Sequence, residues 1–310
     1  NILEGEFVVR HFAGATKEWL EFVVNNRKGK STEEYELVMG PVANDQLYAT
    51  IRLYEQGVIT ADAAIVVNEA TGEVLFEKNA DKREYPASMT KIMTCILALE
   101  NGKMDRIVET SSNAANVECT RLQPGYELRL GDMLQQMMMI SDNGCATAVG
   151  ETLAGGDIDY FAQIMNRKAQ MLGMTGSHFV NANGMPDSGH YSTARDMSKL
   201  ACYAMQNQQF RRIVGTNEIN IYYIQPQAHS EHCVNTNELL RSYPGCTGGK
   251  TGWTSAAQGC LMAAAQRDGR ELLVIVMHSA DEDTRFSEAA ALLDYGFSKK
   301  TDSTVGTIGK

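Results

Sequence analysis

With 310 residues, 44% of them hydrophobic, the chain is long enough for one large domain or two and for a sizeable apolar core. Its net charge of −10, with no basic cluster, argues against a nucleic-acid partner. No uninterrupted apolar run is long enough to cross a bilayer, so a membrane-spanning helix is not expected.

The first sixty residues are interpreted as a separate small α/β segment. Residues 1–6 have neither the basic start nor the apolar core of a signal peptide, so we expect no export signal in this sequence. The residue pattern predicts strands at 7–10 and 35–38, helices at 15–24 and 45–56, and a loop at 25–34.

Two stretches of this segment, WLEFVVNNR at 19–27 and GPVAND at 40–45, carry a resemblance. They resemble the C-terminal half of an uncharacterised bacterial domain family, for which a relationship to ADP-ribosyltransferases is one hypothesis. Because the front half of such a domain would be missing, no catalytic role transfers. We interpret residues 1–60 as an appendage of unknown role and favour one without activity.

From residue 61 the pattern predicts an α+β domain, with one antiparallel sheet flanked by helices. Apolar runs at 63–67 and 73–76 flank Thr71 and Gly72 and indicate a hairpin. Residues 298–310 are polar and predicted to form a flexible tail, which leaves 61–297 as the main domain. Further strands are predicted at 218–224, 248–254, 259–265 and 271–277, and helices at 88–99, 131–139, 143–153, 158–172, 193–205 and 284–293.

Ser88 and Lys91 form the first of three short motifs with chemical meaning. In a helix, positions i and i+3 share one face, so the lysine amine can reach the serine hydroxyl and take its proton. A serine at a helix N-terminus also gains from the positive end of the helix dipole. The pair offers a nucleophile with an adjacent base, the minimum for covalent catalysis, although chance alone produces this pattern in many chains.

Ser141-Asp142-Asn143 is the second motif. An apolar run at 133–140 precedes it and small residues at 144–154 follow it, which predicts a tight junction between two helices. A hydroxyl and a carboxamide exposed at such a junction can relay protons and hold an amide substrate.

Lys250-Thr251-Gly252 is the third motif, and Trp253 follows it directly. Threonine, tryptophan and the nearby glycines suit a strand edge that a substrate backbone can approach closely. The lysine adds a positive charge, and the threonine hydroxyl can bind a carboxylate.

In this order the three motifs resemble the signatures of serine penicillin-binding proteins and class A β-lactamases. Flanking residues at 68–72, 182–186 and 192–197 are most similar to low-molecular-mass D-alanyl-D-alanine carboxypeptidases, and the resemblance covers about 61–297. It implies the penicillin-recognising (β-lactamase/transpeptidase-like) fold, an antiparallel sheet flanked by helices with a helical subdomain.

The resemblance implies a peptidoglycan stem peptide ending in D-Ala-D-Ala as substrate and β-lactams as inhibitors, without cofactor or metal. Ser88 would attack the penultimate D-Ala carbonyl, Lys91 would accept its proton and Ser141 would relay a proton. We expect burial and the charge of Lys250 to lower the pKa of Lys91. The residues that would bind substrate are Asn143, Lys250, Thr251, Gly252 and Trp253.

Two further roles follow from the resemblance. The backbone N–H groups of Ser88 and Trp253 would surround the oxyanion of the tetrahedral intermediate. Arg285 falls where carboxypeptidases often carry an arginine near the substrate carboxylate.

Structural interpretations stand beside these roles. Ser88 could be an ordinary helix N-cap, and Ser141 and Asn143 could cap the following helix. The three motifs together disfavour the first of these. His190 is interpreted as a loop histidine, and the sequence supports no Ser-His-Asp triad. The methionines at 133 and 137–139 are interpreted as core residues.

Two alternative functions remain open. A class A β-lactamase needs a glutamate that activates the deacylating water, and the expected region, GSHFVN at 176–181, contains none. A catalytically inactive peptidoglycan-binding module would not need Ser88 and Lys91. Endopeptidase or transpeptidase activity within the same family cannot be separated by motifs, because it depends on pocket shape and acceptor access.

Seven cysteines leave at least one thiol unpaired within the chain. Cys95, Cys145 and Cys202 are predicted to be buried structural thiols. For Cys246 and Cys260 we favour free thiols, and a disulfide between them is the alternative. By resemblance the protein acts outside the cytoplasm, in the cell wall or periplasm, and membrane association is not encoded in this chain.

Overall fold

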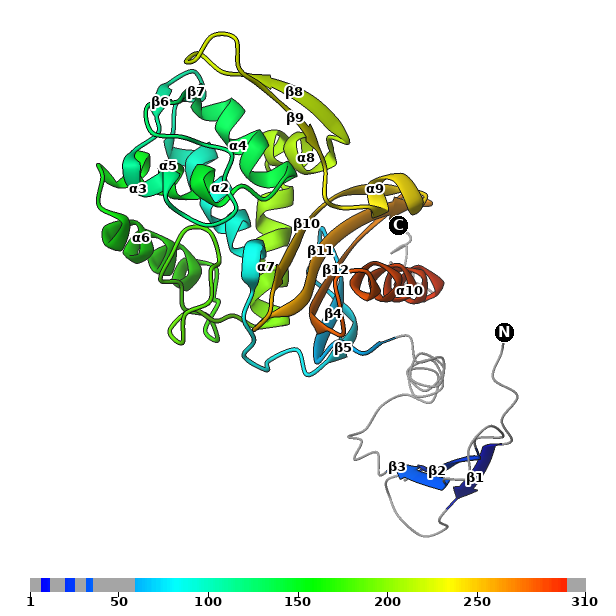
Figure 1. Cartoon of the computed structure of the whole chain (residues 1–310). Coiled ribbons are helices and arrows are strands. Elements are labelled where there is room, and N and C mark those ends of the chain that lie inside the picture. Colours follow the sequence, from blue (N-terminus) through cyan, green and yellow to red (C-terminus); the bar gives the residue numbers. More distant parts are fainter. Residues whose placement is uncertain (1–6, 12–19, 26–31, 36–58, 300–310) are drawn as a thin grey trace, which may run out of the picture. The chain divides into compact units, whose positions relative to one another are not determined.

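The computed structural model describes residues 7–11, 20–25, 32–35 and 59–299 (Figure 1). The chain divides into two compact units, residues 1–59 and 60–310, and each is described by itself. None of the helices in the described part of the chain is both long and apolar enough to cross a membrane.

The first unit contains a three-stranded antiparallel sheet of β1 (Phe7–His11), β2 (Leu20–Asn25) and β3 (Thr32–Tyr35). The strand predicted at 7–10 is confirmed. The helix predicted at 15–24 is wrong from residue 20 onward, and the loop predicted at 25–34 is wrong over 32–34. Aromatic and β-branched side chains in FVV favour a strand once β1 and β3 pair with both edges. The helix predicted at 45–56 lies outside the described residues.

The second unit is built on a five-stranded antiparallel sheet with the order β10-β11-β12-β4-β5. Its strands are β4 (Ala63–Asn68), β5 (Val74–Lys78), β10 (Cys246–Thr254), β11 (Gln258–Arg267) and β12 (Arg270–Ser279). The predicted hairpin and the three predicted C-terminal strands are thus confirmed. Because β12 pairs with β4, the two ends of this unit meet in one sheet, and β10 is left at its edge.

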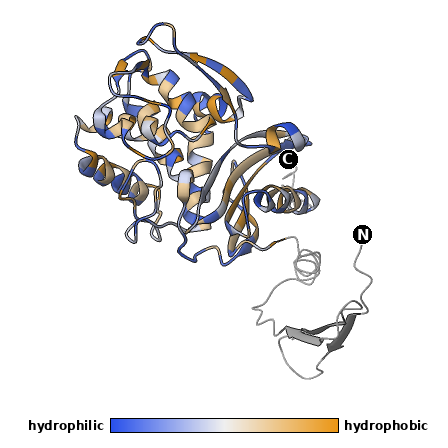
Figure 2. Ribbon diagram, viewed as in Figure 1, coloured by the Kyte–Doolittle hydropathy of each residue, from blue (hydrophilic) through white to orange (hydrophobic). Residues whose placement is uncertain are grey.

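Helices cover both faces of this sheet. Helix α7 (Ala194–Met205) packs on β12 and β4, and α10 (Thr284–Ser298) packs on β12 and β11. Strand β12 is therefore buried over the run Leu272–Met277, with no polar residue to alternate with the apolar ones. Figure 2 shows the apolar residues gathered on these inner strands. Helix α10 extends to Ser298, so the flexible tail predicted from residue 298 is wrong at that residue, and residues 300–310 lie outside the described part.

A helical subdomain lies beside the sheet edge formed by β10 (Figure 1). The 3₁₀ turn η1 and helices α2, α4 and α5 carry most of its core, and Met133, Met137, Met138 and Met139 are buried there as predicted. Its elements are η1 (Ala87–Thr90), α2 (Lys91–Asn101), α3 (Ser112–Ala115), α4 (Leu130–Met139), α5 (Asn143–Ala154), α6 (Ile158–Met171) and α8 (Gln208–Gly215).

Smaller elements complete the unit. Strands β6 (Ile107–Glu109) and β7 (Glu127–Arg129) form one pair, and β8 (Glu218–Tyr222) and β9 (Ser230–Val234) form another. The strand predicted at 218–224 is confirmed as β8, whereas its partner β9 was not predicted. The short helix α9 (Leu239–Ser242) precedes β10.

All seven cysteines are free thiols. Cys246 pairs with Ala265 across β10 and β11, whereas Cys260 pairs with Gly252, so the two cysteines face different points of the ladder. Free thiols, the favoured alternative, are therefore confirmed. Cys95 and Cys145 are buried as predicted, whereas Cys202 is only partly buried.

Candidate active site

The three motifs meet where the helical subdomain faces strand β10. Ser88 lies on η1, Ser141 and Asn143 lie at the junction of α4 and α5, and Lys250 lies on β10. Hydrogen bonds link them: Lys91 binds Ser88 and Asn143, and Lys250 binds Ser141. The backbone of β10 at Gly252 also lies against the Ser88 nitrogen of η1, so the structure brings all three motifs into one site.

Ser88 lies on a 3₁₀ turn and not on the α-helix that the sequence predicted; the α-helix begins at Lys91. A 3₁₀ turn has three residues per turn, so positions i and i+3 eclipse one another. The Lys91 Nζ atom accordingly lies 2.8 Å from Ser88 Oγ. Neither η1 nor α2 receives a capping bond from the Ser88 side chain, so the N-cap interpretation of this serine is wrong.

The Lys91 side chain is fully buried and surrounded by oxygen atoms. Its Nζ lies 2.7 Å from Asn143 Oδ1 and 2.7 Å from the backbone oxygen of Asn183. These two acceptors take both N–H bonds of a neutral amine, which leaves the nitrogen lone pair for the Ser88 hydroxyl proton. Burial lowers the pKa of Lys91 to about 7, against the opposing negative charge of Asp142. The amine is therefore poised to act as a base near neutral pH.

The junction between α4 and α5 is held by a carboxylate that sequence reasoning did not single out. Asp142 is the N-cap of α5, and its side chain accepts a bond from Cys145 N at 3.0 Å. The cap is thus neither Ser141 nor Asn143. The carboxylate also accepts bonds from Thr120 Oγ1, Arg121 N and Gln136 Nε2. An aspartate directly before a predicted helix was the available signal for this role.

With Asp142 fixed, the residues on either side point their polar atoms into the site. Ser141 has a positive φ of 62°, a backbone conformation that turns its hydroxyl toward Lys250 at 2.9 Å. The Asn143 amide group donates to the Glu118 backbone oxygen at 2.9 Å while its oxygen accepts from Lys91. These bonds fix which way the carboxamide faces.

Strand β10 forms the opposite wall. Lys250 is buried, and its Nζ donates to Ser141 Oγ and, at 2.8 Å, to the Thr251 backbone oxygen. Burial lowers the pKa of Lys250 well below its usual range, and the nearby charges of Lys91 and Arg285 lower it further. The expected influence of one lysine on the other thus falls on Lys250, whereas burial accounts for the lowered pKa of Lys91.

The Thr251 hydroxyl does not stand alone on this wall. Its Oγ1 lies 2.6 Å from Thr236 Oγ1, in the loop between β9 and α9. Two neighbouring hydroxyls can hold both oxygen atoms of a carboxylate. No signal in the sequence points to Thr236, because this residue belongs to no motif and reaches the site only through the fold.

Two glycines let neighbouring backbones approach η1: Gly252 on β10 and Gly184 on the segment 179–190. A Cβ atom at Gly252 would lie 3.0 Å from the Ser88 nitrogen, and one at Gly184, which has a φ of +92°, would clash with the Ala87 oxygen. The Ser88 N–H thus lies next to β10 just before Trp253. Arg285 is buried and donates to the Gly252 backbone oxygen at 2.9 Å, so the structure places it against the strand that would hold the substrate.

The segment 179–190 supports Lys91 from the other side. His190 is buried, and its Nδ1 accepts a bond from Val180 N at 3.1 Å, which leaves Nε2–H to donate to Thr90 Oγ1 at 2.8 Å. Burial lowers the pKa of His190 to about 4, so it stays neutral near pH 7. It is a loop histidine, as predicted, and within residues 59–299 no histidine is hydrogen-bonded to Ser88.

Asp62, Glu84 and His278 gather at another point of the unit, with ligand atoms close enough to surround a cation. The Lys82 ammonium lies 2.8 Å from Asp62 and 2.7 Å from Glu84, so a side-chain cation already neutralises this cluster.

Two families match this chain, and their matches overlap at residues 51–79. The family described as D-alanyl-D-alanine carboxypeptidase matches residues 51–281. A second family, described as a protein of unknown function (DUF3990), matches residues 2–79 and so covers the N-terminal unit.

Individual relatives agree with the first match. The chain is 35% identical over 247 residues to D-alanyl-D-alanine carboxypeptidase DacF of Bacillus subtilis, a match that covers 77% of this chain but only 62% of that protein. It is 31% identical over 256 residues to DacB2 of Mycobacterium tuberculosis, covering 80% of this chain and 86% of the relative.

Among solved structures, the DD-transpeptidase of Streptomyces K15 is similar with a TM-score of 0.74 and 31% sequence identity, over 78% of this chain and 98% of that one. The penicillin-recognising fold expected for the main domain is therefore confirmed.

Proposed function

We propose that this chain, which belongs to the D-alanyl-D-alanine carboxypeptidase family of serine peptidases, removes the terminal D-Ala from peptidoglycan stem peptides through an acyl-enzyme on Ser88. One observation carries the proposal: the buried Lys91 amine lies between Ser88 Oγ and two oxygen acceptors, with a pKa lowered to about 7. A serine needs such a base to become a nucleophile.

Acylation begins when neutral Lys91 takes the Ser88 proton as Oγ bonds to the carbonyl carbon of the penultimate D-Ala. The N–H groups of Ser88 and Trp253 would stabilise the negative charge that develops on the carbonyl oxygen, and the close approach of Gly252 to the Ser88 nitrogen supports this role. The carbon–nitrogen bond then breaks, and the proton that Lys91 took from Ser88 passes to the departing nitrogen through Ser141, which is hydrogen-bonded to Lys250. The peptide is left as an ester of Ser88.

Binding groups fix the direction in which the peptide lies. Lys250 and the paired hydroxyls of Thr251 and Thr236 would hold the terminal carboxylate, and the Asn143 amide would hold the donor's backbone. The donor peptide then runs along β10 from Thr251 toward Trp253. Arg285, bonded to the Gly252 oxygen, would fix this strand and add positive charge behind it.

Deacylation needs a water molecule and a base, and Lys91 is placed to serve again after losing its proton. A β-lactam ring opened by Ser88 stays attached to the enzyme, so slow hydrolysis and inhibition by penicillins are expected. An amine acceptor in place of water would give transpeptidation, the activity named for the Streptomyces relative. We favour water, and we infer that the reaction takes place outside the cytoplasm, where peptidoglycan lies.

Intact-mass measurement after incubation with benzylpenicillin tests the proposal, together with D-Ala release from a D-Ala-D-Ala peptide. We expect a stable adduct of one penicillin on the wild type and on Ser112→Ala, an exposed serine, and none on Ser88→Ala. Rapid turnover of penicillin would indicate a β-lactamase instead. A folded wild-type protein without any adduct would indicate an inactive binding module.

A further inference from the structure

A cleft of about 340 Å³ lies outside the catalytic groups and is lined by Arg83, Glu84, Tyr85, Ser188 and Tyr191. Its volume lies at the lower end of the range for ligand sites. None of the three motifs contributes to its lining.

Backbone pairing orients the walls of this cleft. Glu84 and Ser192 exchange hydrogen bonds of 2.8 and 2.9 Å as an antiparallel bridge. Because side chains alternate along extended backbone, Arg83 and Tyr85 lie on the same face of this bridge as Tyr191, which is the cross-strand neighbour of Tyr85. The Arg83 guanidinium lies over the Tyr191 ring, 4.5 Å from its centre.

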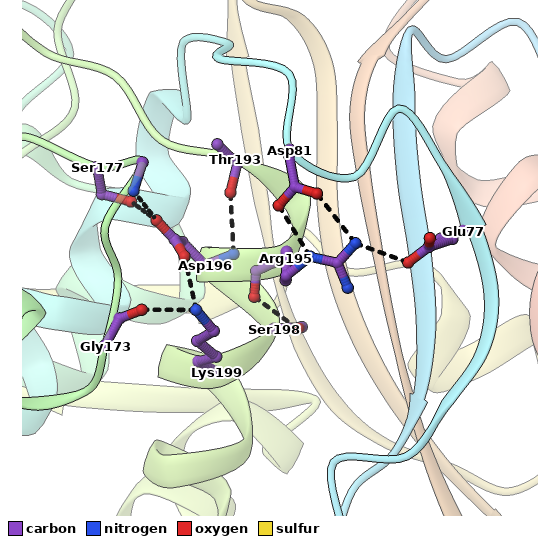
Figure 3. Close-up of polar contacts among 10 residues, drawn as sticks. Glu77, Asp81, Gly173, Ser177, Thr193, Arg195, Asp196, Ser198 and Lys199 are labelled. Atoms are coloured by element: carbon purple, nitrogen blue, oxygen red, sulfur yellow. Dashed lines mark hydrogen bonds and ion pairs between the residues drawn. The ribbon is translucent and has the colours of Figure 1, made fainter.

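The chain that follows Tyr191 is firmly held. Thr193 caps α7 by accepting a bond from Asp196 N, and Arg195 pairs with Asp81 and Glu77 (Figure 3). Figure 3 shows these groups pointing toward one another across the start of α7. On the other side His190 is bonded to Thr90, two residues beyond the nucleophile. The cleft is therefore fixed relative to Ser88.

The cleft lies toward the donor end of the proposed substrate. Strand β10 runs past Trp253 to the end of the sheet where β11 begins and β12 ends. The segment leading to Ser88 crosses that same end, because Cys260 Sγ donates to the Tyr85 oxygen and Glu84 lies 3.7 Å from His278. Tyr85 lies three positions before Ser88, at most about 10 Å of chain, which an extended peptide covers in about three residues.

Charge indicates what the cleft would hold. In the part of the chain that the structure describes, no carboxylate forms an ion pair with Arg83, whereas the carboxylate of Glu84 is neutralised by Lys82 at 2.7 Å. An arginine held over an aromatic ring keeps its planar fork free for a carboxylate. The Ser188 and tyrosine hydroxyls can donate to the same group.

We propose that this cleft is a donor-side subsite in which Arg83, stacked on Tyr191, binds a carboxylate carried two or three residues before the scissile bond. The inference rests on the proposed function, because that function sets the direction of the peptide. It makes the enzyme selective for donor peptides that keep this carboxylate free over those in which it is amidated.

Two synthetic peptides ending in D-Ala-D-Ala test the subsite, identical except that a carboxylate three residues before the scissile bond is free in one and amidated in the other. The measured quantity is the ratio of kcat/KM for the free acid to kcat/KM for the amide. We expect Arg83→Gln to lower this ratio about fivefold, mostly through KM, since an exposed charged contact contributes at most about 1 kcal/mol. Arg83→Lys should lower it less.

Arg167→Gln on the exposed side of α6 is the matched control and should leave the ratio unchanged. Damage to folding would lower both rates and leave the ratio intact, so the ratio reports the contact itself. An unchanged ratio in Arg83→Gln overturns the subsite. Peptides linked to a glycan give a second test: if Arg83→Gln lowers kcat/KM only for these peptides, whether amidated or not, the cleft binds a sugar and the subsite is likewise overturned. Absence of penicillin acylation in the wild type would instead overturn the proposed function.

Discussion

The two walls of the active site each bury a lysine, yet they surround its amine differently. On the helical wall, Lys91 meets two carbonyl-type oxygens besides Ser88, and the negative charge of Asp142 opposes the effect of burial on its pKa. On the sheet wall, Lys250 meets a hydroxyl and one backbone oxygen, and the charges that act on it are the cations of Lys91 and Arg285.

From this difference we propose different roles for the two lysines. Lys91 is balanced between its two protonation states near neutral pH, as a base requires. Lys250 lacks a counter-charge, so an incoming carboxylate would stabilise its charged form and gain affinity in return. The comparison teaches that the partners of a buried lysine, more than burial itself, decide whether it moves protons or binds anions.

Replacing Lys91 by Met gives the largest expected effect. Methionine has a similar shape but cannot accept a proton, so acylation by benzylpenicillin should slow about a thousandfold. The second-order acylation rate measures this, with the exposed Lys103→Met as control. Acylation at the wild-type rate in Lys91→Met would show that another group deprotonates Ser88.

Lys250→Met should have a smaller and more selective effect. Loss of a charged hydrogen bond to the terminal carboxylate should lower kcat/KM about 10- to 100-fold for a peptide with a free C-terminus. The loss should be much smaller for the corresponding C-terminal amide, which has no charge to bind. Equal losses on both peptides would mean that Lys250 serves the chemical step, and the division of work between the two walls would not hold.

Local patterns predicted the strands and helices of the main domain well, because long amphipathic or apolar runs at 131–139, 143–153 and 259–277 leave little ambiguity. The helix expected at 15–24 failed for a different reason: its residues suit a strand equally well, and pairing with β1 and β3 decided the outcome. The 3₁₀ turn at Ser88 also escaped prediction, since it depends on contacts with Gly184 and Gly252 far along the chain.

The residues of the site likewise fall into those that local sequence predicted and those that only the fold brings together. The Ser88–Lys91 pair was predictable because the two residues are only three positions apart in the sequence. Asn183, whose backbone oxygen holds Lys91, lies 92 residues away and contributes an atom that every residue type possesses. Thr236 and His190 likewise act through contacts between distant segments. Sequence shows the reacting groups, and only the fold shows what orients them.

The pH dependence of acylation also distinguishes the two lysines, and it is the smallest of the expected effects. Lys91 must be neutral, and its pKa is about 7, so the rate should fall about tenfold for each pH unit below that value and level off above it. Lys250 must be charged, so the loss of its proton at higher pH should weaken binding and add a falling limb. His190, with a pKa of about 4, stays neutral throughout and should add nothing.

Benzylpenicillin is a suitable probe because its own carboxylate remains ionised over this range. In Lys250→Met the falling limb should vanish while the rising limb persists, whereas Lys103→Met should keep both. A rate that does not change between about pH 5.5 and 8 would contradict the assignment of Lys91 as the base, because a base with a pKa of about 7 changes its protonation state within this range.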